Sequence, residues 1–191
     1  NRTESSIPRI IGTKDEYSYE ILRLDDMEGL VVGNKTDCCF TVLGNGYSCL
    51  KHAATSKNGR ILVIKKNNEI LAHSWIWRNG DLLCLDNIEI SKTISQVEFF
   101  EVYLQLADEI MKKSFKEEGL DSCIKNITIG FTNFDKEVNG IENYSCLISK
   151  TCDLKEKNFG DRLGQNRKYV DVLPQPLEEV GYSDSKNVQY L

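Results

Sequence analysis

The stretch from Arg60 to Ile90, RILVIKKNNEILAHSWIWRNGDLLCLDNIEI, carries the strongest structural signal in the sequence. Three runs within it are rich in aliphatic and aromatic residues and have the length of β-strands. Asn67-Asn68 and Asn79-Gly80 separate the runs, and both pairs suit tight turns because Asn and Gly tolerate positive φ. We therefore predict a three-stranded antiparallel meander over residues 60–90. Its strands span residues 60–66, 69–78 and 81–90.

One long helix is predicted directly after the meander, over residues 95–118. Ser95 suits the N-cap position, and Glu98 three residues later completes a capping box. Lysines gather near the far end, where the helix dipole favours positive charge, and Gly119 ends the helix. Apolar residues at helical spacing define one face that we expect to be buried. They are Phe99, Val102, Leu106 and Ile110.

The segments on either side complete an α+β prediction. Residues 126–132 (NITIGFT) are predicted as a strand that runs parallel to the last strand of the meander. Tyr17–Leu24 is predicted as a first strand and Ser48–Ala54 as a helix. Two closing strands are predicted at residues 169–173 and 187–191. The expected fold is a mixed, mainly antiparallel sheet with one long helix.

Length and composition indicate a single globular domain. The 191 residues are 40% hydrophobic and 28% charged, and no apolar run approaches the roughly 20 residues of a membrane-spanning helix. The net charge of −5 argues against a general nucleic-acid-binding protein, which needs a basic surface. We assign residues 17–191 to the domain and residues 1–16 to a linker or N-terminal extension. Because Asn1–Ser6 resembles the end of a linker, we expect the domain to be part of a larger protein.

The seven cysteines indicate a reducing environment. Their number is odd, whereas a secreted scaffold normally pairs all of its cysteines. They also lie among apolar residues, as Cys84 does in Leu82–Leu85 and Cys146 does beside Leu147. Such cysteines behave as small hydrophobic residues. We therefore expect free thiols and a cytoplasmic location.

The order of the elements resembles the GNAT superfamily of N-acyltransferases. The resemblance covers residues 17–191 in element order and about 60–135 in local sequence. It implies that acetyl-CoA or another acyl-CoA lies between the last meander strand and the strand after the long helix, with its pyrophosphate on backbone N–H groups at the helix N-terminus. The family motif there is [Q/R]-x-x-G-x-[G/A]. Gln96 suits its first position, but Phe99 and Glu101 occupy the two small-residue positions.

The resemblance also implies roles for individual residues. Glu89 is the expected general base, and Tyr144 is the expected acid that reprotonates the leaving thiolate. The cofactor-binding residues that it implies are Ile88, Ile90, Ser91, Lys92, Thr93, Ser95, Gln96 and Asn133. A simpler interpretation is that Glu89 faces solvent and Tyr144 has no chemical role. The acceptor, a small-molecule or protein amine, is not determined. The alternative is a GNAT-derived binding module that has lost the cofactor.

A zinc site is a further hypothesis, built from Cys38, Cys39, Cys49 and His52. Cysteine and histidine are the usual zinc ligands, and Cys49 and His52 have i, i+3 spacing on a predicted helix. Adjacent cysteines on a strand point to opposite faces, however, and no Cys-x-x-Cys pair is present. We therefore favour buried thiols over a zinc site and predict no metal.

A third function class is a cysteine hydrolase or transglutaminase-like enzyme. His73 in Ala72-His73-Ser74-Trp75, followed by Asn79-Gly80 and Asp86, is similar to the H-x-W…D-G…D pattern of that family. Cys49 is then the nucleophile, His73 the base and Asp86 the group that orients it. The spacing from Cys49 to His73 is short for that family, and Leu50 replaces the usual aromatic residue.

Trp75 and Trp77 share one face of their predicted strand with His73. Such a stripe suits either a stacking platform for a ring or a part of the core. We favour the core and expect it to lie beneath the long helix.

Overall fold

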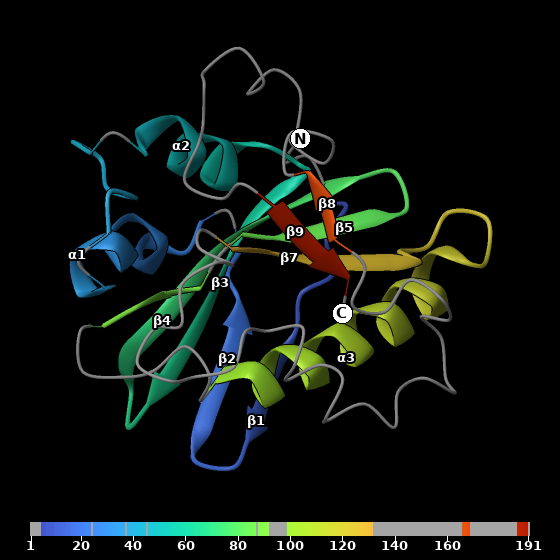
Figure 1. Cartoon of the computed structure of the whole chain (residues 1–191), viewed down its shortest axis with the longest axis horizontal. Coiled ribbons are helices and arrows are strands. Elements are labelled where there is room, and N and C mark those ends of the chain that lie inside the picture. The colour runs from blue at the N-terminus through green and yellow to red at the C-terminus, as the bar shows by residue number, and fades with distance from the viewer. Residues whose placement is uncertain are drawn as a thin grey trace.

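The computed structural model describes residues 5–23, 25–36, 38–44, 46–86, 88–91, 99–131, 166–168 and 187–190. Figure 1 shows how the helices surround a strongly twisted sheet. The elements are β1 (Ile11–Lys14), β2 (Tyr17–Ile21), the 3₁₀ helix η1 (Met27–Leu30), α1 (Val32–Thr36), α2 (Tyr47–Thr55), β3 (Gly59–Lys66), β4 (Glu69–Asn79), β5 (Leu82–Leu85), β6 (Glu89–Ile90), α3 (Phe100–Glu118), β7 (Asn126–Phe131), β8 (Asn166–Lys168) and β9 (Asn187–Tyr190).

The strands form one mixed sheet in the order β1-β2-β3-β4-β5-β7-β9-β8, with β6 paired to β4. The pair β5–β7 is parallel, and the other pairs are antiparallel. This arrangement confirms the predicted α+β class, with a meander, a long helix and a following strand parallel to the meander. Within the described ranges, no helix has the length and apolar character needed to cross a bilayer.

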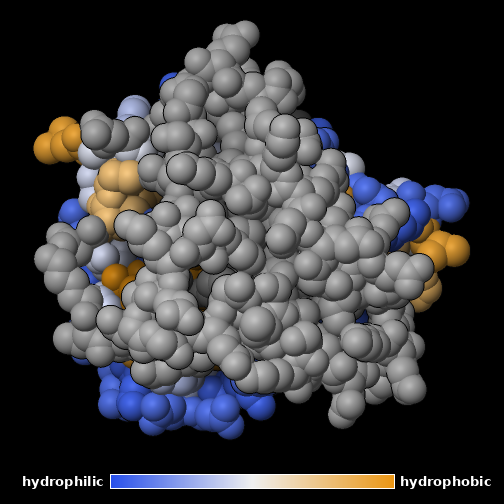
Figure 2. Space-filling view, viewed as in Figure 1, coloured by the Kyte–Doolittle hydropathy of each residue, from blue (hydrophilic) through white to orange (hydrophobic). Residues whose placement is uncertain are grey.

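The turns of the meander follow the expected chemistry. Asn67 and Asn68 both have positive φ, at 51° and 65°, and Gly80 has a φ of 62°. Asn and Gly enter this left-handed region at lower cost than other residues. The polar tips of the β1–β2 and β3–β4 hairpins form a hydrophilic edge of the molecule (Figure 2).

The third predicted strand, 81–90, is interrupted. Leu85 is paired with Ile76 of β4, and Glu89 is paired with His73 of the same strand. The four residue steps from Leu85 to Glu89 therefore lie opposite only three steps of β4, from Ile76 to His73. One extra residue on one strand is the signature of a β-bulge. The bulge divides the strand into β5 and β6.

Two apolar cores cover the two faces of the sheet. One includes α3 and holds the predicted apolar face of that helix, of which Phe99, Leu106 and Ile110 are fully buried. The other holds Trp75 and Trp77. The two tryptophans are therefore core residues as predicted, but the expectation that they lie beneath the long helix was wrong. They pack with residues of α1 and α2, because alternation along β4 directs them to the face opposite α3.

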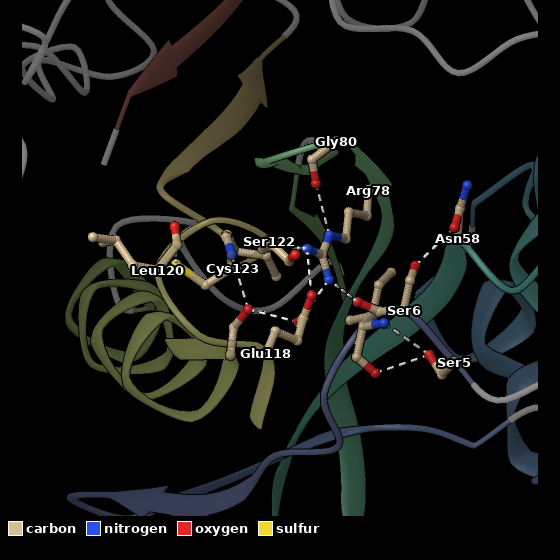
Figure 3. Close-up of polar contacts among 12 residues, drawn as sticks. Ser5, Ser6, Asn58, Arg78, Gly80, Glu118, Leu120, Ser122 and Cys123 are labelled. Atoms are coloured by element: carbon tan, nitrogen blue, oxygen red, sulfur yellow. Dashed lines mark hydrogen bonds and ion pairs between the residues drawn. The ribbon is translucent and has the colours of Figure 1, made fainter. Parts of the chain in front are cut away.

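Arg78, at the end of β4, ties distant segments together (Figure 3). Its side chain is 8% exposed and forms a bidentate ion pair with Glu118 at the end of α3. It also donates hydrogen bonds to the carbonyl oxygens of Gly80, Ser6 and Ser122. We call this arrangement the Arg78 clasp. It holds the N-terminal segment, the meander and the end of α3 in one place.

The two ends of the chain differ in part from the sequence prediction. The stretch 1–16, assigned to a linker or extension, contains β1, which was not predicted and pairs with β2. The domain boundaries stay a prediction. β8 was not predicted either, whereas β9 agrees with the closing strand at 187–191. The strand predicted at 169–173 lies outside the described residues.

The start of the long helix is later than predicted. α3 begins at Phe100, with Phe99 at its N-cap position. The predicted N-cap Ser95 and its capping-box partner Glu98 lie outside the described residues. The C-terminal end of α3 agrees with the prediction, because Gly119 follows Glu118 with a φ of 75°.

Candidate functional site

The backbones of β5 and β7 diverge at the point where the family resemblance places the acyl-CoA. The two parallel strands are in register from the pair Leu82–Asn126 to the pair Leu85–Ile129. Beyond Leu85 the chain bulges and rejoins β4 as β6. β7 instead continues through Gly130 and Phe131 beside β9. The site is thus built at the bulge, where two neighbouring strands diverge.

Three consecutive residues at the bulge face alternate sides of the sheet. Ile88 is buried in the core that includes α3, and Ile90 packs against the same core. Side chains alternate along a strand, so Glu89 projects to the opposite face. That is the face covered by α1, which contacts β4. Glu89 is half-buried and lies opposite His73 in the strand register.

The last residue of α1 and the turn after it form the wall around this carboxylate. Thr36 Oγ1 lies 3.0 Å from His73 Nδ1, in a buried hydrogen bond between α1 and β4. The ring of Phe40 packs on the His73 imidazole with a centroid distance of 5.3 Å. Cys38 is close enough to Glu89 for the carboxylate charge to act on its thiol. The α1 side of the site therefore combines the polar pair Thr36 and His73 with the apolar ring of Phe40.

Burial dominates the protonation of this wall. It lowers the pKa of His73 to about 3, so the imidazole is neutral at physiological pH. Burial also raises the pKa of the Cys38 thiol well above its ordinary value, and the charge of Glu89 adds to that shift. Glu89 thus has uncharged groups, His73 and the Cys38 thiol, beside it.

The structure describes four of the predicted site residues: Ile88, Glu89, Ile90 and Ser91. The backbone N–H of Ser91 donates to the carbonyl of Leu71, which fixes the end of β6 against β4. The other predicted residues lie outside the described ranges. They are Lys92, Thr93, Ser95, Gln96, Asn133 and Tyr144. Their roles stay predictions.

Three further observations bear on whether acyl-CoA fits here. Phe99, at the first small-residue position of the motif, directs its ring into the core, where it contacts Tyr17 edge to face at 5.2 Å. Glu101, at the second position, is exposed in the first turn of α3. Thr128 of β7 is fully buried, and the described residues supply no hydrogen-bond partner for its Oγ1. A buried polar atom lacking a partner next to the divergence suits a polar ligand.

Comparisons with known proteins support the fold. No family model and no curated protein matches the chain. A probable acetyltransferase of the GNAT family from Chromobacterium violaceum superposes with a TM-score of 0.51, at 9% identity, over 99% of this chain and 93% of the other. This chain has the GNAT fold.

Two other solved structures with the GNAT fold show similarity with lower scores. A GNAT family acetyltransferase from Elizabethkingia anophelis with acetyl-CoA bound has a TM-score of 0.46 and 17% identity, over 93% of this chain and 99% of the other. The PaiA N-acetyltransferase from Thermoplasma acidophilum, in complex with coenzyme A, has a TM-score of 0.48 and 11% identity, over 92% and 99%.

The two competing sites are not favoured by the geometry. Among the described residues, which include Cys38, Cys39, Cys49 and His52, no three His, Cys, Asp or Glu side chains are grouped as metal ligands. Cys49 is 3% exposed within the core, where a nucleophile has little access to a substrate. His73 Nδ1, the atom that an orienting acid needs, is hydrogen-bonded to Thr36 instead. With a pKa of about 3, His73 is also a weak base.

The wall residues Thr36, Cys38 and Phe40 were not predicted as parts of the GNAT site. Thr36 and Phe40 carried no sequence signal, because α1 is only five residues long and contains Gly33 and Asn34, which favour turns. Cys38 did attract attention, but as a metal ligand. Only its position next to Glu89 in space connects it to this site.

Proposed function

We propose that the chain is an acyl-CoA-dependent N-acyltransferase that uses Glu89 as its general base. The observation that carries the proposal is the bulge at the divergence of β5 and β7, which directs the Glu89 carboxylate to the α1 face. The GNAT fold supports the reaction class at a coarse level. The acceptor is a small-molecule or protein amine.

In this proposal the backbone at Ile88 and Ile90 would hold the acyl-CoA, which supplies the acyl group as a thioester. Glu89 receives a proton from the acceptor amine, directly or through a water molecule. The neutral His73 keeps the Glu89 side of the sheet free of a competing positive charge. Thr36 fixes the orientation of the imidazole through its hydroxyl. Tyr144 remains the proposed acid for the thiolate.

The test replaces Glu89 by glutamine, which keeps the shape and removes the base. We expect Glu89→Gln to lower turnover by about 10²–10⁴-fold with little change in the affinity for acyl-CoA. Release of free CoA from acetyl-CoA, in the presence of a panel of amines, is the measurement. Glu69→Gln, at the exposed start of β4, is the matched control. Equal turnover in the two variants would contradict the role of Glu89.

A second candidate function is a GNAT-derived binding module without the cofactor. The observation that favours it is Glu101, whose exposed carboxylate lies in the first turn of α3 where a pyrophosphate would bind. A negative charge at a helix N-terminus stabilises the helix but repels an anion. We expect Glu101→Gln to tighten acyl-CoA binding if the enzyme hypothesis is correct. If neither wild type nor Glu101→Gln binds acetyl-CoA in calorimetric titrations, the binding module is the better account.

A further inference from the structure

Cys38 and Cys39 are adjacent thiols on the rim of the candidate site. Cys39 is exposed and Cys38 is half-buried. Burial raises the pKa of the Cys38 thiol, and the neighbouring Glu89 and Cys39 side chains raise it further. Neither the proposed acyl transfer nor the discarded zinc site gives this pair a role.

The pair lies in a tight turn between α1 and α2. The carbonyl oxygen of Cys39 accepts hydrogen bonds from the backbone N–H groups of Thr41 and Gly46, at 2.8 and 3.2 Å. A Cβ on Gly44 would come within 2.1 Å of the same oxygen. Since Gly44 must pass so close to Cys39, the turn leaves little room for a change in the Cys38–Cys39 backbone. Any change at the two sulfurs must therefore move the neighbouring residues.

The turn is mechanically connected to the site through Phe40. Its backbone N–H donates to the Cys38 Sγ at 3.4 Å, and its ring packs on His73. His73 in turn lies opposite Glu89 in the register of β4 and β6. A short path of contacts thus runs from the two thiols to the proposed base.

We propose that Cys38 and Cys39 form a peroxide-sensitive thiol pair whose oxidation to a disulfide displaces Phe40 from His73 and inactivates the site. Cα atoms joined by a trans peptide are about 3.8 Å apart, whereas disulfides usually join Cα atoms about 4.4–6.8 Å apart. A disulfide between adjacent cysteines is therefore strained. Strained disulfides are readily reduced, which makes them suited to reversible regulation.

The chemistry balances with hydrogen peroxide as the oxidant. The exposed Cys39 thiolate attacks one peroxide oxygen, the O–O bond breaks, and the departing hydroxide takes up a proton to become water. The Cys38 sulfur then attacks the Cys39 sulfur of the sulfenic acid. The S–S bond forms, the S–O bond breaks, and the Cys38 proton leaves with the hydroxyl group as a second water. Cys39 is the more exposed of the two sulfurs and therefore meets peroxide first. The raised pKa of the Cys38 thiol keeps that sulfur protonated and slow to react with peroxide itself.

The first experiment treats the whole chain with dilute hydrogen peroxide and measures its mass. We expect the loss of two hydrogen atoms, mapped to the peptide that contains both cysteines and reversed by reduced glutathione. Cys38→Ser and Cys39→Ser should each abolish this loss. Cys123→Ser, at a buried position of the turn after α3, should not. A disulfide that maps to other cysteines, a dimer linked through Cys39, or no loss at all would overturn the proposal.

A second measurement tests the coupling without any enzyme assay. The chain has two histidines, and the ring of Phe40 is close enough to shift the NMR signals of His73. Oxidation should move the His73 ring signals and leave those of His52 in place. Unchanged His73 signals in fully oxidised protein would show that the turn does not act on the site.

The inactivation step rests on the proposed function. We expect oxidised protein to lose at least tenfold in turnover and to regain it with glutathione, whereas Cys39→Ser should keep its turnover in peroxide. If the reduced protein has no acyltransferase activity, the proposed function fails, while the mass and NMR results still decide the thiol pair. Full turnover in oxidised protein would contradict the inactivation alone.

Discussion

At the scale of single residues, the buried side chain of His73 determines the charge on the α1 face of the site. His73 is 1% exposed on a β-strand and is stabilised by one hydroxyl and one aromatic ring. The imidazole is neutral at physiological pH because its burial would cost the charged form several kcal/mol of hydration. The same residue that sequence reasoning considered as a catalytic base therefore acts as a positioning and packing group.

The buried imidazole predicts an acid-sensitive fold. In the unfolded chain His73 takes up a proton near its ordinary pKa of about 6.5, but in the folded chain only near pH 3. Its stabilising contribution is therefore complete above pH 6.5 and is lost as pH falls toward 3. We expect the free energy of unfolding in urea to decrease by up to about 1.4 kcal/mol per pH unit below pH 6.

His73→Asn is the variant that isolates this effect. Asparagine supplies both a donor and an acceptor for Thr36 but does not titrate. Its stability should vary less between pH 6.5 and pH 5, a window above the ordinary pKa values of Asp and Glu. His52→Asn, which leaves His73 in place, serves as the comparison. An identical pH slope in wild type and His73→Asn would show that His73 is not the titrating group.

At the scale of the elements, the Arg78 clasp fixes the position of α3 relative to β4. The guanidinium joins the end of β4 to the end of α3, so the helix is anchored at its C-terminal end (Figure 3). Charge-assisted bidentate pairs hold both partners in a fixed orientation. The start of α3, where the resemblance places the pyrophosphate, is then positioned by the rest of the helix.

We predict that Arg78→Met lowers the free energy of unfolding by about 3 kcal/mol, because it removes the cation that pairs with Glu118 and the donor to three carbonyl oxygens. Lys112→Met is the control, since Lys112 and Asp108 form an exposed pair, 73% and 45% accessible, which is worth under about 1 kcal/mol. Arg78 and Ser114 lower the pKa of Glu118. The contribution of the pair is complete above the ordinary Glu value and is lost as pH falls through the lowered one. Chemical denaturation at pH 7 measures the difference, and equal losses in both variants would contradict the clasp.

Local patterns account for the elements that the sequence predicted. The meander and α3 carry strong turn residues and a long apolar period, and both were placed within a few residues of their observed bounds. The bulge was missed because the apolar residues on either side of Asp86-Asn87 fit one continuous strand, and the sequence does not show where pairing with β4 slips by one residue. β1 was missed because IGTK is short and polar. The face on which Trp75 lies depends on tertiary packing, which one strand does not determine.

Whole-molecule electrostatics oppose the proposed cofactor. The chain has a net charge of −5, and coenzyme A is itself a polyanion, so long-range repulsion must be offset by local contacts. Screening by salt weakens repulsion between exposed charges beyond about 10 Å. We therefore expect the affinity for acetyl-CoA to stay constant or rise between about 50 and 200 mM salt, because the Debye length shortens over this range. A steep fall would point instead to a basic binding surface.

Ligand-linked stability gives the most direct test of the cofactor. A ligand that binds only the folded chain stabilises it by about 2.7 kcal/mol when present at 100 times its dissociation constant. We expect acetyl-CoA to produce a shift of this size in urea unfolding. Acetyl-pantetheine, which lacks the nucleotide and the pyrophosphate, should give a smaller one at equal concentration. The difference between the two ligands measures what the turn before α3 contributes despite Phe99 and Glu101. If acetyl-pantetheine stabilises the chain as well as acetyl-CoA does, the divergence of β5 and β7 binds the acyl arm and the helix N-terminus binds nothing. If neither ligand changes the unfolding midpoint at millimolar concentration, the GNAT fold of this chain serves a purpose other than acyl transfer.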